Sequence, residues 1–263
     1  MKIEPKERAI EVHDLTVVYD QKPALWDIDF ELPKGKLIGI IGPNGSGKST
    51  LIKTIMGLLE PSSGWVNIFD EKIEKVRHKV SYVPQRESVD WDFPTNVMDV
   101  VLMGRYGRKN LFRRTSKLDR EIATECLEKV GMLPFAKRQI AQLSGGQQQR
   151  VFMARALAEK AEMYLMDEPF AGVDAATESS IFKVFQEVRD SGKTMMVVHH
   201  DLQSAAKYFD WVVLMNTRLV AAGPIEEVFT PELLAEAYGG ELKILSQIYD
   251  IIREKQFPIR EKR

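Results

Sequence analysis

Hydrophobic and polar residues follow two different periods along this chain. Between residues 10 and 32 apolar side chains alternate with polar ones, at Ile10 and Val12 and again at Ile28, Phe30 and Leu32, which predicts strands with one buried face. Continuous apolar runs at residues 37–41, 163–166 and 194–198 predict strands buried on both faces. Further strands are expected at residues 65–69, 80–83, 211–215 and 219–222.

Apolar residues three and four positions apart predict helices between these strands. The first such stripe consists of Leu51, Ile52, Ile55, Leu58 and Leu59. Others cover residues 119–130 and 151–158, and a helix after Asp174 is expected to end at Gly192. A last stripe lies at residues 244–252. Strands that alternate with helices predict a fold of the α/β class.

A glycine-rich loop joins the strand at 37–41 to the first helix. It consists of Gly42, Pro43, Asn44, Gly45, Ser46, Gly47, Lys48, Ser49 and Thr50 and fits the pattern G-x-x-x-x-G-K-[ST]. Its backbone N–H groups and the helix start behind them form a concavity for phosphate oxygens. Lys48 adds a charge near the β- and γ-phosphates, and the Ser49 hydroxyl suits Mg²⁺. The flanking strand and helix disfavour a plain glycine-rich turn.

Polar residues at two strand ends suggest hydrolytic chemistry. Asp167 and Glu168 follow the strand at 163–166. A carboxylate there can hold Mg²⁺ through water, and Glu168 can orient or deprotonate a water molecule. Gln85, at the end of the strand at 80–83, is placed to reach the metal or the attacking water, although exposed glutamines are common.

Three further positions are candidates for nucleotide contacts. Ser144, Gly145 and Gly146 open a helix, so its N–H groups form a second candidate phosphate site. Tyr19 suits stacking on an adenine ring and equally suits a small hydrophobic core. The pair at 199–200 follows a strand, where neighbours face opposite ways, so one histidine on the γ-phosphate is favoured over a structural metal site.

The loop at residues 90–94 carries two large aromatic side chains, Trp91 and Phe93, among polar neighbours. Such side chains favour a docking surface over a solvated loop. A basic stretch follows at 104–109 and continues at Arg113 and Arg114.

Net charge, the length of the apolar runs and the cysteine content limit the classes of protein that fit this sequence. The 263 residues carry a net charge of −1, so we expect no nucleic-acid partner. No run of 18 apolar residues occurs, and the first residues do not resemble a signal peptide. The one cysteine, Cys126, lies on an apolar helical stripe and is expected to be buried. We therefore expect a soluble cytoplasmic protein.

The order of these motifs resembles the nucleotide-binding subunit of ATP-binding-cassette (ABC) transporters over about residues 8–240. Leu143, Ser144, Gly145, Gly146 and Gln147 match the family signature. The resemblance implies that Tyr19 stacks on adenine, Gln85 is the Q-loop glutamine, Asp174 belongs to the D-loop and His200 is the switch histidine. The D-loop reads Ala-Gly-Val-Asp where many members have Ser-Ala-Leu-Asp, and Asp174 is retained.

The same resemblance implies a P-loop NTPase (RecA-like) core with an antiparallel β subdomain and an inserted α-helical subdomain. The expected parts are a β subdomain with the P-loop part of the core (1–86), a helical signature subdomain (87–160), the rest of the core (161–224) and a C-terminal helical extension (225–263).

The mechanism implied by the resemblance involves a head-to-tail homodimer. Each ATP lies between the phosphate loop of one subunit and Ser144, Gly145 and Gly146 of the partner subunit. Glu168 activates the attacking water, and Gln85 and His200 sense the γ-phosphate. Mg²⁺ binds Ser49, Gln85 and, through water, Asp167. A membrane permease docks between Gln85 and Tyr106, on the cytoplasmic face of the membrane, and an extracytoplasmic metal-binding protein acts indirectly.

A narrower resemblance points to bacterial importers of the manganese, zinc and iron group, and to manganese importers in particular. It rests on residues 82–86, 89–94, 101–107 and 170–177. The ion need not touch this chain, so importers of zinc, iron chelates or a vitamin remain alternatives. A soluble ABC ATPase of DNA repair or translation is disfavoured by the single cassette and the absence of sustained heptads. A kinase or GTPase would have no use for the signature.

Overall fold

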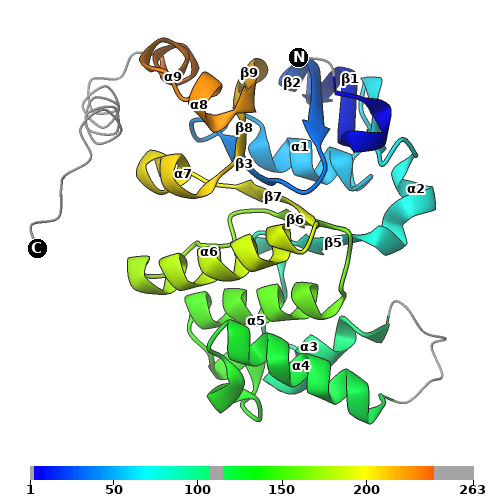
Figure 1. Ribbon diagram of the computed structural model, residues 1–263, viewed down its shortest axis with the longest axis vertical. Coiled ribbons are helices and arrows are strands. Elements are labelled where there is room, and N and C mark those ends of the chain that lie inside the picture. The colour runs from blue at the N-terminus through cyan, green and yellow to red at the C-terminus, as the bar shows by residue number, and fades with distance from the viewer. Residues whose placement is uncertain (1–2, 107–114, 240–263) are drawn as a thin grey trace, which may run out of the picture. The chain divides into compact units, whose positions relative to one another are not determined.

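The computed structural model describes residues 3–106 and 115–239 (Figure 1). The chain divides into two compact units, one formed by residues 1–70 with 198–263 and the other by residues 71–197. We call them the phosphate-loop unit and the signature unit. The predicted helical stripe at 244–252 and the basic residues Arg113 and Arg114 lie outside the described residues.

The phosphate-loop unit begins with an antiparallel sheet of order β2-β1-β4. Its strands are β1 (Arg8–Tyr19), β2 (Lys22–Pro33) and β4 (Ser63–Ile68), preceded by a short 3₁₀ helix, η1 (Pro5–Glu7). Val12 of β1 lies opposite Phe30 of β2 and Val66 of β4. The period-two pattern therefore predicted β1 and β2 correctly, and their buried alternate side chains form one face of the core.

A second group of strands in this unit carries the phosphate loop. Strand β3 (Leu37–Ile41) is completely buried and pairs in parallel with β8 (Trp211–Asn216), which pairs antiparallel with β9 (Arg218–Pro224). Helix α1 (Lys48–Ile55) follows the loop. Among its described residues this unit also contains helices α7 (Leu202–Tyr208), α8 (Ile225–Val228) and α9 (Pro231–Tyr238).

Helix α1 ends earlier than its hydrophobic stripe predicts. Gly57 adopts a positive φ of 66°, and the N–H groups of Gly57 and Leu58 donate to the carbonyl groups of Thr54 and Lys53. This Schellman arrangement satisfies the last carbonyl groups and stops the helix. Leu58 consequently lies outside the helix and is 53% exposed, so the prediction that it belongs to the inner face was wrong.

The signature unit contains three parallel strands, β5 (Val80–Val83), β6 (Met163–Met166) and β7 (Thr194–Val198). All three were predicted, β6 and β7 from their continuous apolar runs. Its helical elements are α2 (Ile73–Val76), η2 (Arg77–Lys79), η3 (Arg86–Ser88), α3 (Val97–Met103), α4 (Lys117–Lys129), η5 (Leu133–Phe135), η6 (Ile140–Gln142), α5 (Gly145–Ala158) and α6 (Ala175–Asp190). Helices α3, α4 and α5 pack against one another, as the green ribbons of Figure 1 show.

The cores of both units follow the sequence pattern closely. Cys126 of α4 is buried as predicted, and burial raises the pKa of its thiol to about 11. On α6, Ile181, Val184 and Phe185 are buried, whereas Val188 is half-buried. Among the described residues no helix combines the length and apolar character needed to cross a membrane.

Candidate functional site

The phosphate loop is held so closely by its neighbours that glycine is required at two positions. A side chain on Gly42 would begin 2.0 Å from the Met215 carbonyl oxygen of β8. Gly47 has a φ of 94°, and a Cβ added to it would lie 2.4 Å from the Ala24 carbonyl oxygen of β2. The fold therefore presses the loop backbone between two strands and fixes its curvature before any ligand binds.

The polar groups of this loop are concentrated and buried. Lys48 is 5% exposed, and its ammonium group donates to the carbonyl oxygens of Gly42 (2.9 Å) and Pro43 (2.8 Å). The Ser46 hydroxyl is buried and has no hydrogen-bond partner among the described residues. The phosphate loop thus combines the Lys48 ammonium group, the Ser46 hydroxyl and the N-terminus of α1. This combination of donors and positive charge suits a phosphate group.

Tyr19 lies at the end of β1, directly before a hairpin turn. Asp20 and Gln21 have φ values of 44° and 67°, as in the type I′ turns that join antiparallel strands tightly. The Tyr19 side chain is 46% exposed, so it is not part of a small hydrophobic core. The structure therefore favours the stacking alternative of the two that the sequence left open, and adenine stacking remains a prediction.

The two histidines after β7 have different surroundings. His199 is 1% exposed, its Nε2 lies 2.6 Å from the Ser204 hydroxyl oxygen, and its ring packs against Phe209. Burial, reinforced by the neighbouring His200, lowers the pKa of His199 to about 4, so it is neutral at physiological pH. The His200 side chain is exposed and accessible to a ligand.

The signature unit brings Gln85 and Glu168 together. Asp167 is completely buried, and its N–H group donates to the Val83 carbonyl oxygen, which aligns the ends of β6 and β5. As a result Gln85 Nε2 lies 3.3 Å from Glu168 Oε2. Glu168 adopts a positive φ of 49°, an unfavourable conformation of the kind found at functional sites.

Burial near this pair also affects a tyrosine. Burial and the neighbouring charge of Asp167 raise the pKa of Tyr82 to about 12, so its hydroxyl keeps its proton.

The signature segment forms the start of α5, as predicted. The Ser144 hydroxyl accepts from the Gln147 N–H group, and the Gln147 side chain accepts from the Ser144 N–H group. This capping box defines where the helix begins. A side chain on Gly146 would begin 2.5 Å from the Gly172 carbonyl oxygen, so the segment packs directly against the turn that follows Glu168.

Asp174 has a structural role that the sequence did not reveal. Its carboxylate accepts from the Thr177 N–H group (2.9 Å) and from the Thr177 hydroxyl (2.7 Å), and it caps the N-terminus of α6. These two hydrogen bonds lower the pKa of Asp174, which is therefore ionised under ordinary conditions. A contact with nucleotide remains a prediction for this residue.

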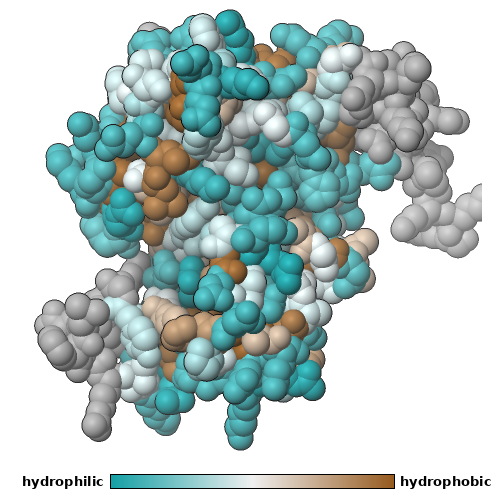
Figure 2. Space-filling view, turned by 180° about the vertical axis from the view of Figure 1, so that it is seen from behind, coloured by the Kyte–Doolittle hydropathy of each residue, from teal (hydrophilic) through white to brown (hydrophobic). Residues whose placement is uncertain are grey.

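Of the two aromatic side chains predicted to form a docking surface, only Phe93 is exposed. Trp91 is half-buried: its indole N–H donates to the Arg86 carbonyl oxygen (2.8 Å), and its ring meets Phe152 edge-on at 4.8 Å. Phe93 is 57% exposed. Trp91 therefore anchors the loop, Phe93 is the more exposed of the two, and docking of a partner on these side chains remains a prediction. The face drawn in Figure 2 is mostly hydrophilic with small separate hydrophobic patches.

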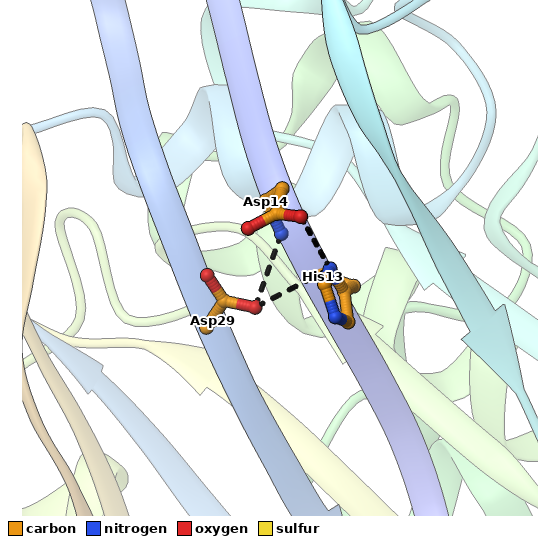
Figure 3. Close-up of side chains that lie close together, drawn as sticks. All are labelled: His13, Asp14 and Asp29. Carbon is orange, nitrogen blue, oxygen red and sulfur yellow. Dashed lines mark hydrogen bonds and ion pairs between the residues drawn. The ribbon is translucent and has the colours of Figure 1, made fainter.

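One cluster of side chains was not predicted. His13 Nδ1 lies 2.8 Å from Asp14 Oδ2 and 3.6 Å from Asp29 Oδ1 (Figure 3). Neighbours in a strand normally face opposite ways, but an irregularity in β1 and the positive φ of Asp14 bring both to one side. All three side chains are at least half exposed, and the backbone N–H group of Asp14 donates to Asp29 Oδ1 at 3.1 Å. The three therefore form a surface cluster of the kind that contributes little to stability.

The structure thus describes two groups of candidate residues. Tyr19, the phosphate loop and His200 lie in the phosphate-loop unit. Gln85, Asp167, Glu168, the signature segment and Asp174 lie in the signature unit. Sequence reasoning missed Arg86 and Gln148, which contact the signature segment; the position of an arginine directly after Gln85 was the available signal.

Comparison with known proteins identifies the family. The family model described as "ABC transporter" matches residues 25–171, more than half of the chain. The chain belongs to the ABC transporter family. The cassette is 58% identical to the manganese transport system ATP-binding protein MntB of Bacillus subtilis, covering 90% of this chain and 94% of that one. It is 55% identical to the zinc transport system ATP-binding protein TroB of Treponema pallidum, covering 89% and 88%.

Solved structures agree with this assignment. A nucleotide-free ATP-binding cassette from an ABC transporter has a TM-score of 0.73 and 27% identity, and the match covers 92% of this chain and 98% of that one. A dimeric, post-hydrolysis ATP-binding cassette bound to ADP and Pi has a TM-score of 0.74 and 28% identity, covering 82% and 98%. The predicted fold class is confirmed, and the chain is an ATP-binding ATPase of the ABC type.

Proposed function

We propose that this cassette hydrolyses ATP to power uptake of a divalent metal ion, most simply manganese, through a separate membrane permease. The hydrolytic part rests on one observation, the hydrogen bond that joins Gln85 to Glu168 at the ends of two adjacent strands. The manganese assignment rests on similarity over nearly the whole chain to the Bacillus protein.

Nucleotide binding is assigned to the phosphate-loop unit. The loop of residues 42–50 receives the phosphates, Lys48 supplies the charge near the β- and γ-phosphates, and Tyr19 stacks on adenine. The rigid glycine positions and the buried Ser46 hydroxyl fit this role, because they form a polar concavity that is preformed.

The residues proposed for Mg²⁺ fit that ion chemically. Ser49, Gln85 and Asp167 offer hydroxyl, amide and carboxylate oxygens, the donors that Mg²⁺ prefers. Asp167 is completely buried, so its carboxylate is suited to an inner, water-bridged position. When bound, the ion neutralises charge on the phosphates.

Hydrolysis is assigned to residues with distinct tasks. Glu168 accepts a proton from, or orients, the water that attacks the γ-phosphate in line. Gln85 donates to the Glu168 carboxylate, which holds the carboxylate in one orientation. His200, whose side chain is exposed, contacts the γ-phosphate, while buried His199 supports its backbone.

Two cassettes pair head to tail in this proposal. Each ATP lies between the phosphate loop of one subunit and Ser144, Gly145 and Gly146 of the partner subunit, and Asp174 follows in the D-loop near the same surface. The dimeric relative bound to ADP and Pi supports the pairing of two cassettes. Loss of the γ-phosphate then removes a shared ligand and releases the dimer.

The permease docks on the surface between Gln85 and Tyr106, which keeps the cassette at the cytoplasmic face of the membrane. Phe93 (57% exposed) and Tyr106 (47% exposed) are the large side chains available there. An extracytoplasmic metal-binding protein delivers the ion to the permease and acts on the cassette only indirectly. Zinc is the second candidate cargo, because the Treponema relative is named for it.

Metal uptake tests the proposal. Cells that lack this gene are supplied with wild type or with Glu168→Gln, and entry of radioactive manganese, zinc and iron is measured. We expect wild type alone to restore manganese entry. If wild type restores only zinc entry, zinc and not manganese is the transported ion. Full uptake with Glu168→Gln would contradict the assigned role of Glu168.

A further inference from the structure

Arg86 occupies a special place in the signature unit. It directly follows Gln85, which binds Glu168, and it contacts the segment that begins α5. One short stretch of chain therefore touches both the hydrolytic pair and the signature segment.

The Arg86 side chain lies on the signature segment. Its Nε donates to Gln148 Oε1 at 3.2 Å. A Cβ on Gly145 would lie 2.8 Å from Arg86 Nε and 3.0 Å from its Cζ, so the guanidinium group covers the Gly145 backbone. Gln148 is itself 4% exposed and donates to the Ile140 carbonyl oxygen. The guanidinium group thus rests against buried Gln148 and the half-buried backbone of Gly145.

The backbone around Arg86 is attached to the same helix. The Arg86 carbonyl accepts from Trp91, whose ring packs on Phe152 of α5. The Gln149 side chain donates to the Pro84 carbonyl oxygen at 3.4 Å. Residues 84–91 are consequently joined to α5 by contacts before and after Arg86 as well as by Arg86 itself.

The charge of Arg86 is unusual for its position. The N-terminus of a helix carries partial positive charge, and α5 has no acidic residue in its first turn. Within residues 3–106 and 115–239 no carboxylate lies within ion-pair distance of Arg86. A cation held here opposes the helix dipole, and an anion that approaches the same segment would relieve this opposition.

We propose that Arg86 is a positioning residue that couples the two ATP sites of the dimer. This inference rests on the proposed function, in which Gln85 responds to the subunit's own nucleotide and the signature segment closes on the nucleotide of the partner subunit. Displacement of Gln85 moves Arg86, and Arg86 moves Gly145 and the start of α5. The coupling is reciprocal, so closure of the signature segment also positions Gln85.

ATP-driven dimerisation tests this coupling. The Glu168→Gln chain is expected to bind ATP without turnover and to dimerise, as measured by analytical ultracentrifugation. Adding Arg86→Ala should raise the dimer dissociation constant about tenfold, within the usual range of coupling between sites. ATP binding to the dilute subunit should change less than about twofold, because Arg86 is not a residue of the phosphate loop. Arg86→Lys should give an intermediate value, since it keeps the charge and loses the planar contact.

The matched control is Arg120→Ala in the same background, because Arg120 is an exposed arginine of α4 in the same unit. It should dimerise like the parent, and thermal melting should show all variants folded. If the Arg86→Ala variant dimerises as tightly as the parent, the coupling role is wrong and the proposed function stands. If Glu168→Gln alone stays monomeric with saturating ATP, the head-to-tail dimer is wrong and the Arg86 inference fails with it.

Discussion

The phosphate loop and the signature segment are both glycine-containing helix starts, yet they are built differently. In the phosphate loop, Gly42 meets a backbone carbonyl from a neighbouring strand, and the charge comes from Lys48 within the loop itself. In the signature segment, Gly145 meets a side chain, and the nearby cation, Arg86, comes from a distant part of the sequence. In the first region backbone crowds backbone and the cation belongs to the loop itself, whereas in the second a side chain from elsewhere in the chain covers the glycine and supplies the cation.

The largest effect is expected where a glycine meets backbone. Gly42→Ala should lower ATP affinity by at least roughly 100-fold, because relieving an overpacked contact of this kind costs about 3 kcal/mol. Gly45→Ala is the comparison: Gly45 has a positive φ of 79°, and no atom lies within 4 Å of its added Cβ. Its cost should be about 1 kcal/mol. Equal losses in a nucleotide titration would contradict the distinction between crowding and backbone conformation.

Removing the loop's own cation should have the next largest effect. Lys48→Ala should weaken ATP binding by about 10- to 100-fold, since hydrogen bonds to charged groups contribute about 1.5–3 kcal/mol. Lys53→Ala, at the far end of α1, should leave binding unchanged. Calorimetric titration measures both, and an unchanged affinity for Lys48→Ala would show that the loop backbone alone holds the phosphates.

The pH dependence of stability provides a third test of the phosphate-loop unit. Buried His199 lies beside β3, because its N–H group donates to the Ile40 carbonyl oxygen. Its pKa is about 4 in the folded chain and about 6.5 when unfolded, so the unfolded state gains a proton first as the pH falls. Its contribution to stability is present above pH 6.5 and is lost as the pH falls towards 4. Between pH 7.5 and pH 5 this loss should reach about 2 kcal/mol.

Urea unfolding at the two pH values measures this loss. His199→Gln should lack this part of the pH dependence, and the exposed-histidine control His78→Gln should retain it. Identical pH dependence in wild type and His199→Gln would mean that His199 is not held neutral by burial.

The smallest effect is expected at the signature segment. Ser144→Ala removes the cap of α5 and should cost about 1 kcal/mol of stability. Ser116→Ala removes an equivalent capping box from α4 at a similar cost. Only Ser144→Ala should weaken ATP-driven dimerisation, by about fivefold, in the Glu168→Gln background. Equal dimerisation of the two capping variants would place the nucleotide contact elsewhere.

The sequence predicted the parts of this molecule that depend on local chemistry. The buried runs became β3, β6 and β7, and the capping residue Ser144 began α5 where expected. The predictions failed where the decisive contact came from elsewhere in the chain. Gly57 ended α1 before Leu58, because one left-handed residue outweighs a continuing hydrophobic stripe.

The candidate site shows the same division. The phosphate loop, Gln85 and Glu168 were recognisable because their spacing relative to strands is local. The contact of Trp91 with Phe152 was not predicted, because nothing in the loop around Trp91 shows that Phe152 lies beside it. Arg86 was overlooked, because its partners are about 60 positions further along the chain.

The most direct test of the account is single-turnover hydrolysis of radiolabelled ATP by purified wild-type and Glu168→Gln protein, with ATP binding measured in parallel. The account predicts that the variant binds ATP like wild type and hydrolyses it roughly 10²- to 10⁴-fold more slowly, the range expected for loss of a general base. Hydrolysis by Glu168→Gln at the wild-type rate would contradict the central claim that the Gln85–Glu168 pair performs the chemistry.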